Sequence, residues 1–235
     1  MADAYPRFVP YSTVLFDLDH TLLDSDASER AAFAHTMRFA GVTDHEPLLD
    51  TYRQINLAMW ARVEAGTLLA NDVRTRRFES FNQVAGIDAD PTAMGEVFIQ
   101  GLGSFGELYP GAHELLESVG AVAVMGLVTN GISEVQRARI ARLDIERFFD
   151  AIVISSEVAT SKPGAAIFDI VFDRLGRPER SSAVMIGDSL TSDMAGGHGY
   201  GIATCWYNPN GQQPSVDFEL DHVVSDLGDV VDVVG

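Results

Sequence analysis

Cysteine and lysine are almost absent from this 235-residue sequence, which contains one of each, Cys205 and Lys162. A single cysteine excludes an internal disulfide and leaves too few thiolates for a cysteine-based zinc site. Basic residues are scarce as well, with sixteen against thirty-four acidic ones and a formal charge of -18. Such a negative charge disfavours binding to nucleic-acid polymers and to membranes, but it suits a cation cofactor. We expect a protein of the reducing cytoplasm.

Long hydrophobic runs are also lacking. No segment approaches the length of a membrane span without charged or polar interruptions, and residues 1–12 have no apolar stretch typical of a signal peptide. The chain is nevertheless 46% hydrophobic, which is enough for one well-filled core and a modest second unit. The composition leaves the oligomeric state open.

Four short apolar runs each end in polar residues. They cover residues 13–16, 122–128, 151–154 and 183–186, and helical patterns over 134–143 and 165–175 lie between them. Continuous apolar runs indicate strands buried on both faces, and their alternation with helices predicts an α/β fold with a Rossmann-like parallel sheet. Ligands bind beyond the carboxyl ends of such strands, so the polar residues found there should converge on one site.

Residues 25–105 show helical periodicity and no convincing strand. The expected helix signals are Ser28 as the first cap, Gly41, Gly66 and Gly86 as stops, and Asp90-Pro91 as the start of a fourth helix. We predict a helical cap over 25–105, inserted into a catalytic core made of 1–24 and 106–235. An insert that directly follows a catalytic strand can act as a lid that excludes water.

The first apolar run leads into Asp17-Leu18-Asp19-His20-Thr21. Asp17 could attack phosphorus as a nucleophile, because a carboxylate splits phosphate-ester hydrolysis into two steps through an acyl phosphate. Asp19 could then protonate the leaving oxygen and later deprotonate the attacking water. An ordinary Asx turn after a strand is the structural alternative.

With three further motifs, the sequence resembles the haloacid dehalogenase-like hydrolase superfamily, whose first motif is Asp-x-Asp-x-Thr. The further motifs are Thr129-Asn130-Gly131, Lys162-Pro163 and the stretch from Gly187-Asp188 to Asp193. The resemblance implies that Thr129 and the backbone at Asn130 bind phosphate and that Lys162 neutralises phosphate and nucleophile. Lys162 is the only lysine, which suggests a place where a compact ammonium is required.

The resemblance also implies a magnesium site. Mg²⁺ prefers oxygen ligands, and we expect it to bind the Asp17 carboxylate, the Asp19 backbone carbonyl and Asp188. Asp193 is a supporting residue that could touch a metal-bound water, orient Lys162 or begin the next helix.

Several activities share these motifs. The implied function is a Mg²⁺-dependent phosphatase that hydrolyses a small phosphorylated metabolite through an aspartyl-phosphate. A phosphomutase and a receiver-like phosphorylated binding module remain alternatives, whereas Asp19 argues against a dehalogenase. The segments Tyr52–Asn56 and Gly201–Pro209, with Trp60 and Glu64, are similar to the bacterial pyrimidine 5′-nucleotidase family. That similarity suggests a nucleoside 5′-monophosphate as substrate, with a sugar phosphate as the competitor.

Other conspicuous residues have structural interpretations. We expect His20 only to fit the turn between the two aspartates, and Cys205 to be a small buried hydrophobe. Tyr52, Met59 and Trp60 recur at helical spacing, which is more typical of a core than of a ligand site.

Overall fold

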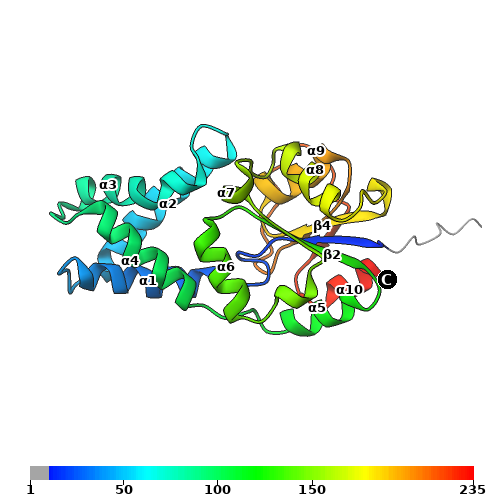
Figure 1. Cartoon of the computed structure of the whole chain (residues 1–235), viewed down its shortest axis with the longest axis horizontal. Helices are drawn as coiled ribbons and strands as arrows, with labels where there is room; N and C mark the ends of the chain where they lie inside the picture. The colour runs from blue at the N-terminus through cyan, green and yellow to red at the C-terminus, as the bar shows by residue number, and fades with distance from the viewer. Residues whose placement is uncertain (1–10) are drawn as a thin grey trace, which may run out of the picture.

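The computed structural model describes residues 11–235, and the chain forms a sheet half and a helical half (Figure 1). The predicted features of residues 1–10 lie outside the described residues. Six parallel strands form one sheet in the order β3-β2-β1-β4-β5-β6. They are β1 (Thr13–Phe16), β2 (Val124–Thr129), β3 (Ala151–Ile154), β4 (Ala183–Gly187), β5 (Ala203–Tyr207) and β6 (His222–Val224). The predicted α/β class with a Rossmann-like parallel sheet is confirmed.

Strand β1 lies between β2 and β4. The next strands along the chain, β2 and β3, lie on one side of β1, and the later strands β4, β5 and β6 lie on the other side. Phe16 pairs with Leu127 of β2 and with Ile186 of β4. Where the strand order reverses in this way, the segments after neighbouring strands diverge and leave a crevice at the carboxyl edge. Asp17 follows β1 directly, and its backbone N–H donates to the Ile186 carbonyl at 2.9 Å. The topology therefore places Asp17 at the crevice.

Helices cover both faces of the sheet (Figure 1). Helices α5 (Ala112–Gly120), α6 (Ser133–Arg142) and α10 (Asp229–Val234) pack on the face that contains Val14 and Phe16 of β1. Helices α8 (Ala165–Arg174) and α9 (Ala195–Tyr200) pack on the face that contains Leu15. Successive strand residues thus enter two different cores, which explains why the strands are apolar throughout.

The helical half, called here the helical insert, lies between β1 and β2 in the sequence. It consists of α1 (Ser25–Phe39), α2 (Leu49–Glu64), α3 (Val73–Ala85) and α4 (Pro91–Ser104). Its core is aromatic and contains Phe33, Tyr52, Phe78, Phe81 and Phe98, all buried. The four helices lie within 25–105, and the limits of a separate cap domain stay a prediction.

Shorter turns join these elements: α7 (Ser155–Val158), 3₁₀ turns at Glu46–Leu48, Ala70–Asp72, Glu146–Phe148 and Arg180–Ser182, and a π-helical turn at Leu190–Met194. None of the helices within 11–235 is long and apolar enough to cross a membrane.

Most of the predicted helix ends are confirmed, but the first cap is wrong. Helix α1 begins at Ser25, because the Asp24 carboxylate accepts a hydrogen bond from the Ala27 N–H at 3.1 Å and caps the helix four residues before Ser28. Gly41, Gly66 and Gly86 have φ values of 77°, 69° and 67° and stand just beyond the ends of α1, α2 and α3. Helix α4 begins at Pro91 with Asp90 as its cap.

Strand β2 begins two residues later than the apolar run that predicted it. The N–H groups of Val122 and Ala123 both bond to the Val119 carbonyl, so these residues continue the turn at the end of α5. Cys205 is buried in β5, as expected.

The aromatic core of the insert yields a stability prediction. Phe81→Ala removes a fully buried ring and should lower the free energy of unfolding by about 3–5 kcal/mol. Phe39→Ala removes a ring that is 55% exposed at the end of α1, and it should change stability by less than about 0.5 kcal/mol. Urea unfolding followed by circular dichroism measures both, and equal effects of the two variants would contradict this core assignment.

Candidate active site

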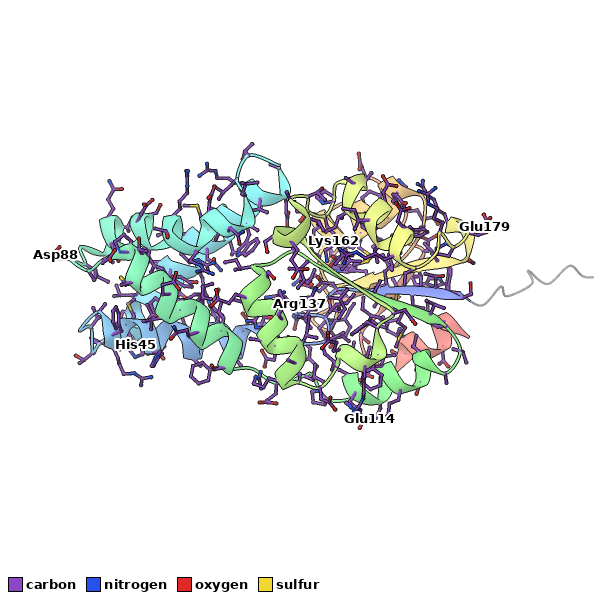
Figure 2. The ribbon with its side chains drawn as sticks, viewed as in Figure 1. His45, Asp88, Glu114, Arg137, Lys162 and Glu179 are labelled. Carbon is purple, nitrogen blue, oxygen red and sulfur yellow. The ribbon has the colours of Figure 1, made fainter. Side chains whose placement is uncertain are left out.

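A cavity of about 390 Å³ lies between the carboxyl edge of the sheet and the helical insert. Five of the predicted site residues line it, namely Asp17, Asp19, Asn130, Asp188 and Asp193. The other two, Thr129 and Lys162, are buried next to them. Figure 2 shows Lys162 inside the sheet half, whereas His45 and Asp88 mark the far end of the insert. The structure therefore gathers all seven predicted residues at one end of the sheet.

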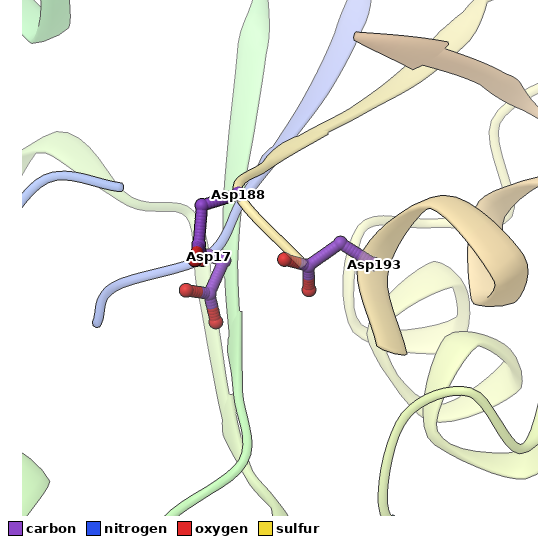
Figure 3. A group of neighbouring side chains, drawn as sticks. All are labelled: Asp17, Asp188 and Asp193. Atoms are coloured by element: carbon purple, nitrogen blue, oxygen red, sulfur yellow. The ribbon is translucent and has the colours of Figure 1, made fainter. Parts of the chain in front are cut away.

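Three carboxylates form a compact cluster (Figure 3). Asp17 follows β1, Asp188 follows β4 and Asp193 lies in the π-helical turn, and one oxygen of each lies within 4.8 Å of the others. The Lys162 ammonium lies 2.5 Å from Asp17 Oδ1 and 2.7 Å from Asp193 Oδ1. One cation against three ionised carboxylates leaves negative charge at this point, which a further cation can neutralise.

Burial and charge shift the pKa values of these groups. Burial raises the pKa of Asp17 well above its ordinary value, against the opposing effect of Lys162. Burial, followed by the nearby Asp193 carboxylate, raises the pKa of Asp188 to about 7. Burial alone would lower the pKa of Lys162, but Asp17 and Asp193 raise it, so the ammonium stays charged.

The chemistry of this donor set fits Mg²⁺. Magnesium binds oxygen, usually through one or two carboxylates together with substrate phosphate and water. Both Asp193 oxygens have other contacts, since Oδ1 faces Lys162 and Oδ2 accepts from the Ser189 N–H at 3.0 Å. Asp188 is held through Thr21, whose hydroxyl accepts from the Asp188 N–H at 3.0 Å. Asp17 and Asp188 are thus the carboxylates best suited to hold the metal.

The Asn130 side chain fixes the position of Lys162. Its Oδ1 accepts from the Lys162 N–H at 2.9 Å, and its Nδ2 donates to the Lys162 carbonyl at 2.9 Å. Both ends of the amide therefore bind the backbone of Lys162. The adjacent Gly131 N–H donates to Ser155 Oγ at 3.0 Å in this structure.

Asp19 lies apart from the carboxylate cluster and accepts hydrogen bonds from three side chains. The donors are Ser25 Oγ at 2.6 Å, Gln136 Nε2 at 2.6 Å and Arg139 Nη1 at 2.7 Å. Burial alone would raise the pKa of Asp19, but Arg139 and the hydrogen bonds lower it below its ordinary value. Gln136 Nε2 also lies 2.7 Å from Thr129 Oγ1, so one amide joins two of the predicted residues. The predicted role of the Asp19 carbonyl stays a prediction.

Arg139 connects Asp19 with the insert. This buried guanidinium donates from Nη2 to Ser28 Oγ at 2.9 Å and from Nε to the Leu102 carbonyl at 2.9 Å. Ser28 lies near the start of α1 and Leu102 in the last turn of α4. Arg139 therefore contacts the insert near both points at which the chain passes between the insert and the sheet half. Sequence reasoning missed Gln136 and Arg139, although they stand three residues apart on one face of α6.

The end of α2 makes a second contact with the sheet half. Glu64 Oε2 accepts from Thr191 Oγ1 at 3.1 Å, and the Val63 carbonyl accepts from Ser161 Oγ at 3.2 Å. Trp60 and Glu64 line the cavity. Trp60 also packs against the small buried cluster that contains Val63 and Val73, so it is a core contact on one side and a cavity wall on the other, whereas Tyr52 is fully buried as expected.

Comparisons with known proteins agree with this arrangement. Residues 14–207 match the family described as haloacid dehalogenase-like hydrolase. The pyrimidine 5′-nucleotidase PynA of Streptococcus pneumoniae is 31% identical over 94% of each chain. The pyrimidine 5′-nucleotidase YjjG of Escherichia coli is 31% identical over 91% of this chain and 93% of its own. The crystal structure of the putative HAD-hydrolase YfnB from Bacillus subtilis, bound to magnesium, superimposes with a TM-score of 0.88 at 27% identity, covering 96% of this chain and 99% of that one.

Close packing at Gly187 leads to a prediction. A Cβ atom at this residue would lie 2.2 Å from Asp193 Oδ2, so Gly187→Ala must displace the carboxylate that pairs with Lys162. We expect it to lower the free energy of unfolding by about 1–3 kcal/mol. Gly199→Ala is the matched control, because nothing lies within 4 Å of its Cβ position in α9. Thermal unfolding compares the two, and unchanged stability of Gly187→Ala would refute the tight fit.

Proposed function

Because the chain belongs to the haloacid dehalogenase-like hydrolase family, we propose that it is a Mg²⁺-dependent phosphatase that cleaves a small phosphomonoester through an aspartyl-phosphate on Asp17. The observation that carries this proposal is the position of the Asp17 carboxylate. It is buried at the crevice after the central strand, 2.5 Å from a buried ammonium and within 4.8 Å of two further carboxylates.

The reaction has two steps. In the first, an Asp17 oxygen forms a bond to phosphorus, the bond from phosphorus to the leaving oxygen breaks, and that oxygen takes a proton from Asp19. Asp19 must therefore enter this step protonated, although Arg139 and its other donors favour the carboxylate in this structure. In the second, Asp19 takes a proton from water as the water oxygen attacks phosphorus. The bond to Asp17 then breaks, inorganic phosphate is released and Asp19 is protonated again.

The surrounding residues hold charge in place during both steps. Lys162 neutralises negative charge on the transferring phosphoryl oxygens, and Asp193 and Asn130 keep its ammonium and backbone in position. Thr129 and the Asn130 backbone bind the phosphate oxygens. Preorganised charge of this kind supplies most of the acceleration in phosphoryl transfer, because the protein has little covalent chemistry to perform.

We assign the metal to Asp17, Asp188 and the Asp19 carbonyl. When bound, Mg²⁺ neutralises phosphate charge and orients the phosphoryl group. The oxygen donor set supports this assignment, as does the magnesium in the YfnB crystal structure.

A nucleoside 5′-monophosphate is the substrate class that we propose. It is supported by the two pyrimidine 5′-nucleotidases that are 31% identical to this chain. A panel of nucleoside monophosphates and sugar phosphates, assayed with Mg²⁺ and with chelator, tests this function. Absence of phosphate release from every ester would overturn it.

Replacement of the nucleophile should abolish turnover. Asp17→Asn keeps the size of the side chain but removes the nucleophilic carboxylate, so kcat should fall by at least about 10³-fold. Phosphate release measures this loss, and circular dichroism checks that the variant folds. Activity close to that of the wild type would refute the role of Asp17.

Lys162→Arg should also lose most activity although the charge is kept. The Lys162 side chain is 1% exposed, and a planar guanidinium does not fit the space of a compact ammonium. Arg177→Lys, at an arginine side chain that is 79% exposed, is the control for an exchange of cations, and its activity should stay unchanged. If Lys162→Arg retained near-normal kcat, a generic positive charge would be sufficient there.

Magnesium affinity should fall as the pH falls through about 7. The pKa of Asp188 is raised to about 7, so below this pH the carboxyl group is protonated and must lose its proton to bind the metal. Between pH 8 and pH 6 we expect about a tenfold loss of affinity, measured by isothermal titration calorimetry with MgCl₂. Equal affinity at both pH values would show that Asp188 does not bind the metal as a carboxylate.

A further inference from the structure

One face of helix α2 runs along the cavity. Arg53, Asn56, Leu57, Trp60 and Glu64 all line it, at the spacing of a single helix face. The eleven steps from Arg53 to Glu64 correspond to about 16 Å along the helix axis, because each step adds 1.5 Å. The cavity is therefore longer than a phosphate group alone requires, and it has room for the leaving group of the substrate.

The two ends of this face lie at different distances from the carboxylate cluster. Glu64 contacts Thr191 at 3.1 Å, and Thr191 lies between Asp188 and Asp193 in the sequence. The Glu64 end is thus the phosphoryl end of the cavity. Arg53, three helical turns away, marks the end that receives the part of the leaving group most distant from phosphorus.

The middle of the face is apolar. Trp60 and Leu57 line the cavity here, and Leu57 is 69% exposed although it is a large hydrophobic residue. Ile132 and Val135, at the start of α6, contribute apolar surface to the same cavity. Ligand pockets combine such apolar and aromatic walls with a few polar groups that fix orientation. The middle of the cavity suits a flat apolar ring.

The far end is polar and fixed by hydrogen bonds. Glu29 Oε2 accepts from Asn56 Nδ2 at 2.8 Å, and Glu29 Oε1 accepts from Arg53 Nε at 3.2 Å. An ionised carboxylate can only accept, so Glu29 sets which end of the Asn56 amide is the NH₂ group. Asn56 Oδ1 is buried and has no hydrogen-bond partner within residues 11–235. A buried acceptor without a partner is unfavourable, and a donor from a ligand would satisfy it.

We propose that Asn56, oriented by Glu29, hydrogen-bonds the polar edge of a nucleobase while Trp60 stacks on its ring. This inference rests on the proposed phosphatase function and assigns the residues that select its substrate. Proteins that bind single bases read the base edge by hydrogen bonds and hold the ring between aromatic or apolar side chains. A sugar phosphate has hydroxyl groups that can donate to Asn56, but it has no flat apolar face on which Trp60 can stack.

Uridine 5′-monophosphate and ribose 5-phosphate test this proposal, because they share the phosphate and the ribose and differ in the base. The quantity to measure is the ratio of their kcat/KM values in the presence of Mg²⁺. For the wild type we expect a ratio of at least about 10 in favour of the nucleotide. Asn56→Ala and Trp60→Leu should each lower the ratio by up to about tenfold, toward a value of 1.

Gln54→Ala is the matched control. Gln54 lies on α2 but is exposed and does not line the cavity, so its removal should leave the ratio unchanged. Circular dichroism and the melting temperature check that each variant folds, and a ratio of two substrates cancels any loss of active enzyme.

The outcomes separate this inference from the function on which it rests. If the wild type hydrolyses both esters with similar kcat/KM, or if Asn56→Ala slows both equally, the nucleobase site is refuted while the phosphatase stands. If the wild type releases phosphate from no ester, the phosphatase itself is wrong. A ratio that falls only in Asn56→Ala and Trp60→Leu supports the assignment.

Discussion

The site depends on the burial of one ammonium among carboxylates. A charge taken out of water is costly unless it is paired at close range and its hydrogen-bonding groups are satisfied. Lys162 meets these conditions through Asp17 and Asp193, and its backbone is held by Asn130. These partners come from the ends of three different strands and turns, so the ion cluster can form only when β1, β2 and β4 are correctly paired. The candidate active site is in this sense a consequence of strand order.

The sequence predicted strands β1 to β4 and the residues at the carboxyl edge of the sheet, because both follow from local patterns, whereas the short strand β6 was not predicted. A strand buried on both faces is a continuous apolar run, and Asp17, Thr129 and Asp188 each follow such a run directly. Ser28 shows where local reasoning failed: it has the residue type of a cap, but Asp24 reaches the free N–H of Ala27 first. Ser28 instead contacts Arg139, which is distant in the sequence.

The residues that support Asp19 could not be predicted in this way. Gln136 and Arg139 lie 117 and 120 positions from Asp19 in the sequence, and they meet it because β1, which precedes Asp19, pairs with β2, which precedes α6. Trp60 and Asn56 pose a related problem, since helical periodicity identifies a face of α2 without telling whether core or cavity lies against it. The predicted roles of the seven motif residues are chemical assignments, and they stay predictions that activity measurements must decide.

The position of Lys162 also determines how the surface of this protein reacts. Because it is the only lysine and its side chain is 1% exposed, residues 11–235 present no ε-amino group to solvent. Acetylation and ubiquitination of lysine, and labelling of lysine by amine-directed reagents, require such a group. Within this part of the chain, the folded enzyme therefore gives these reactions no accessible lysine target. Reaction of Lys162 with a bulky acylating reagent would report that the core around Asp17 has opened.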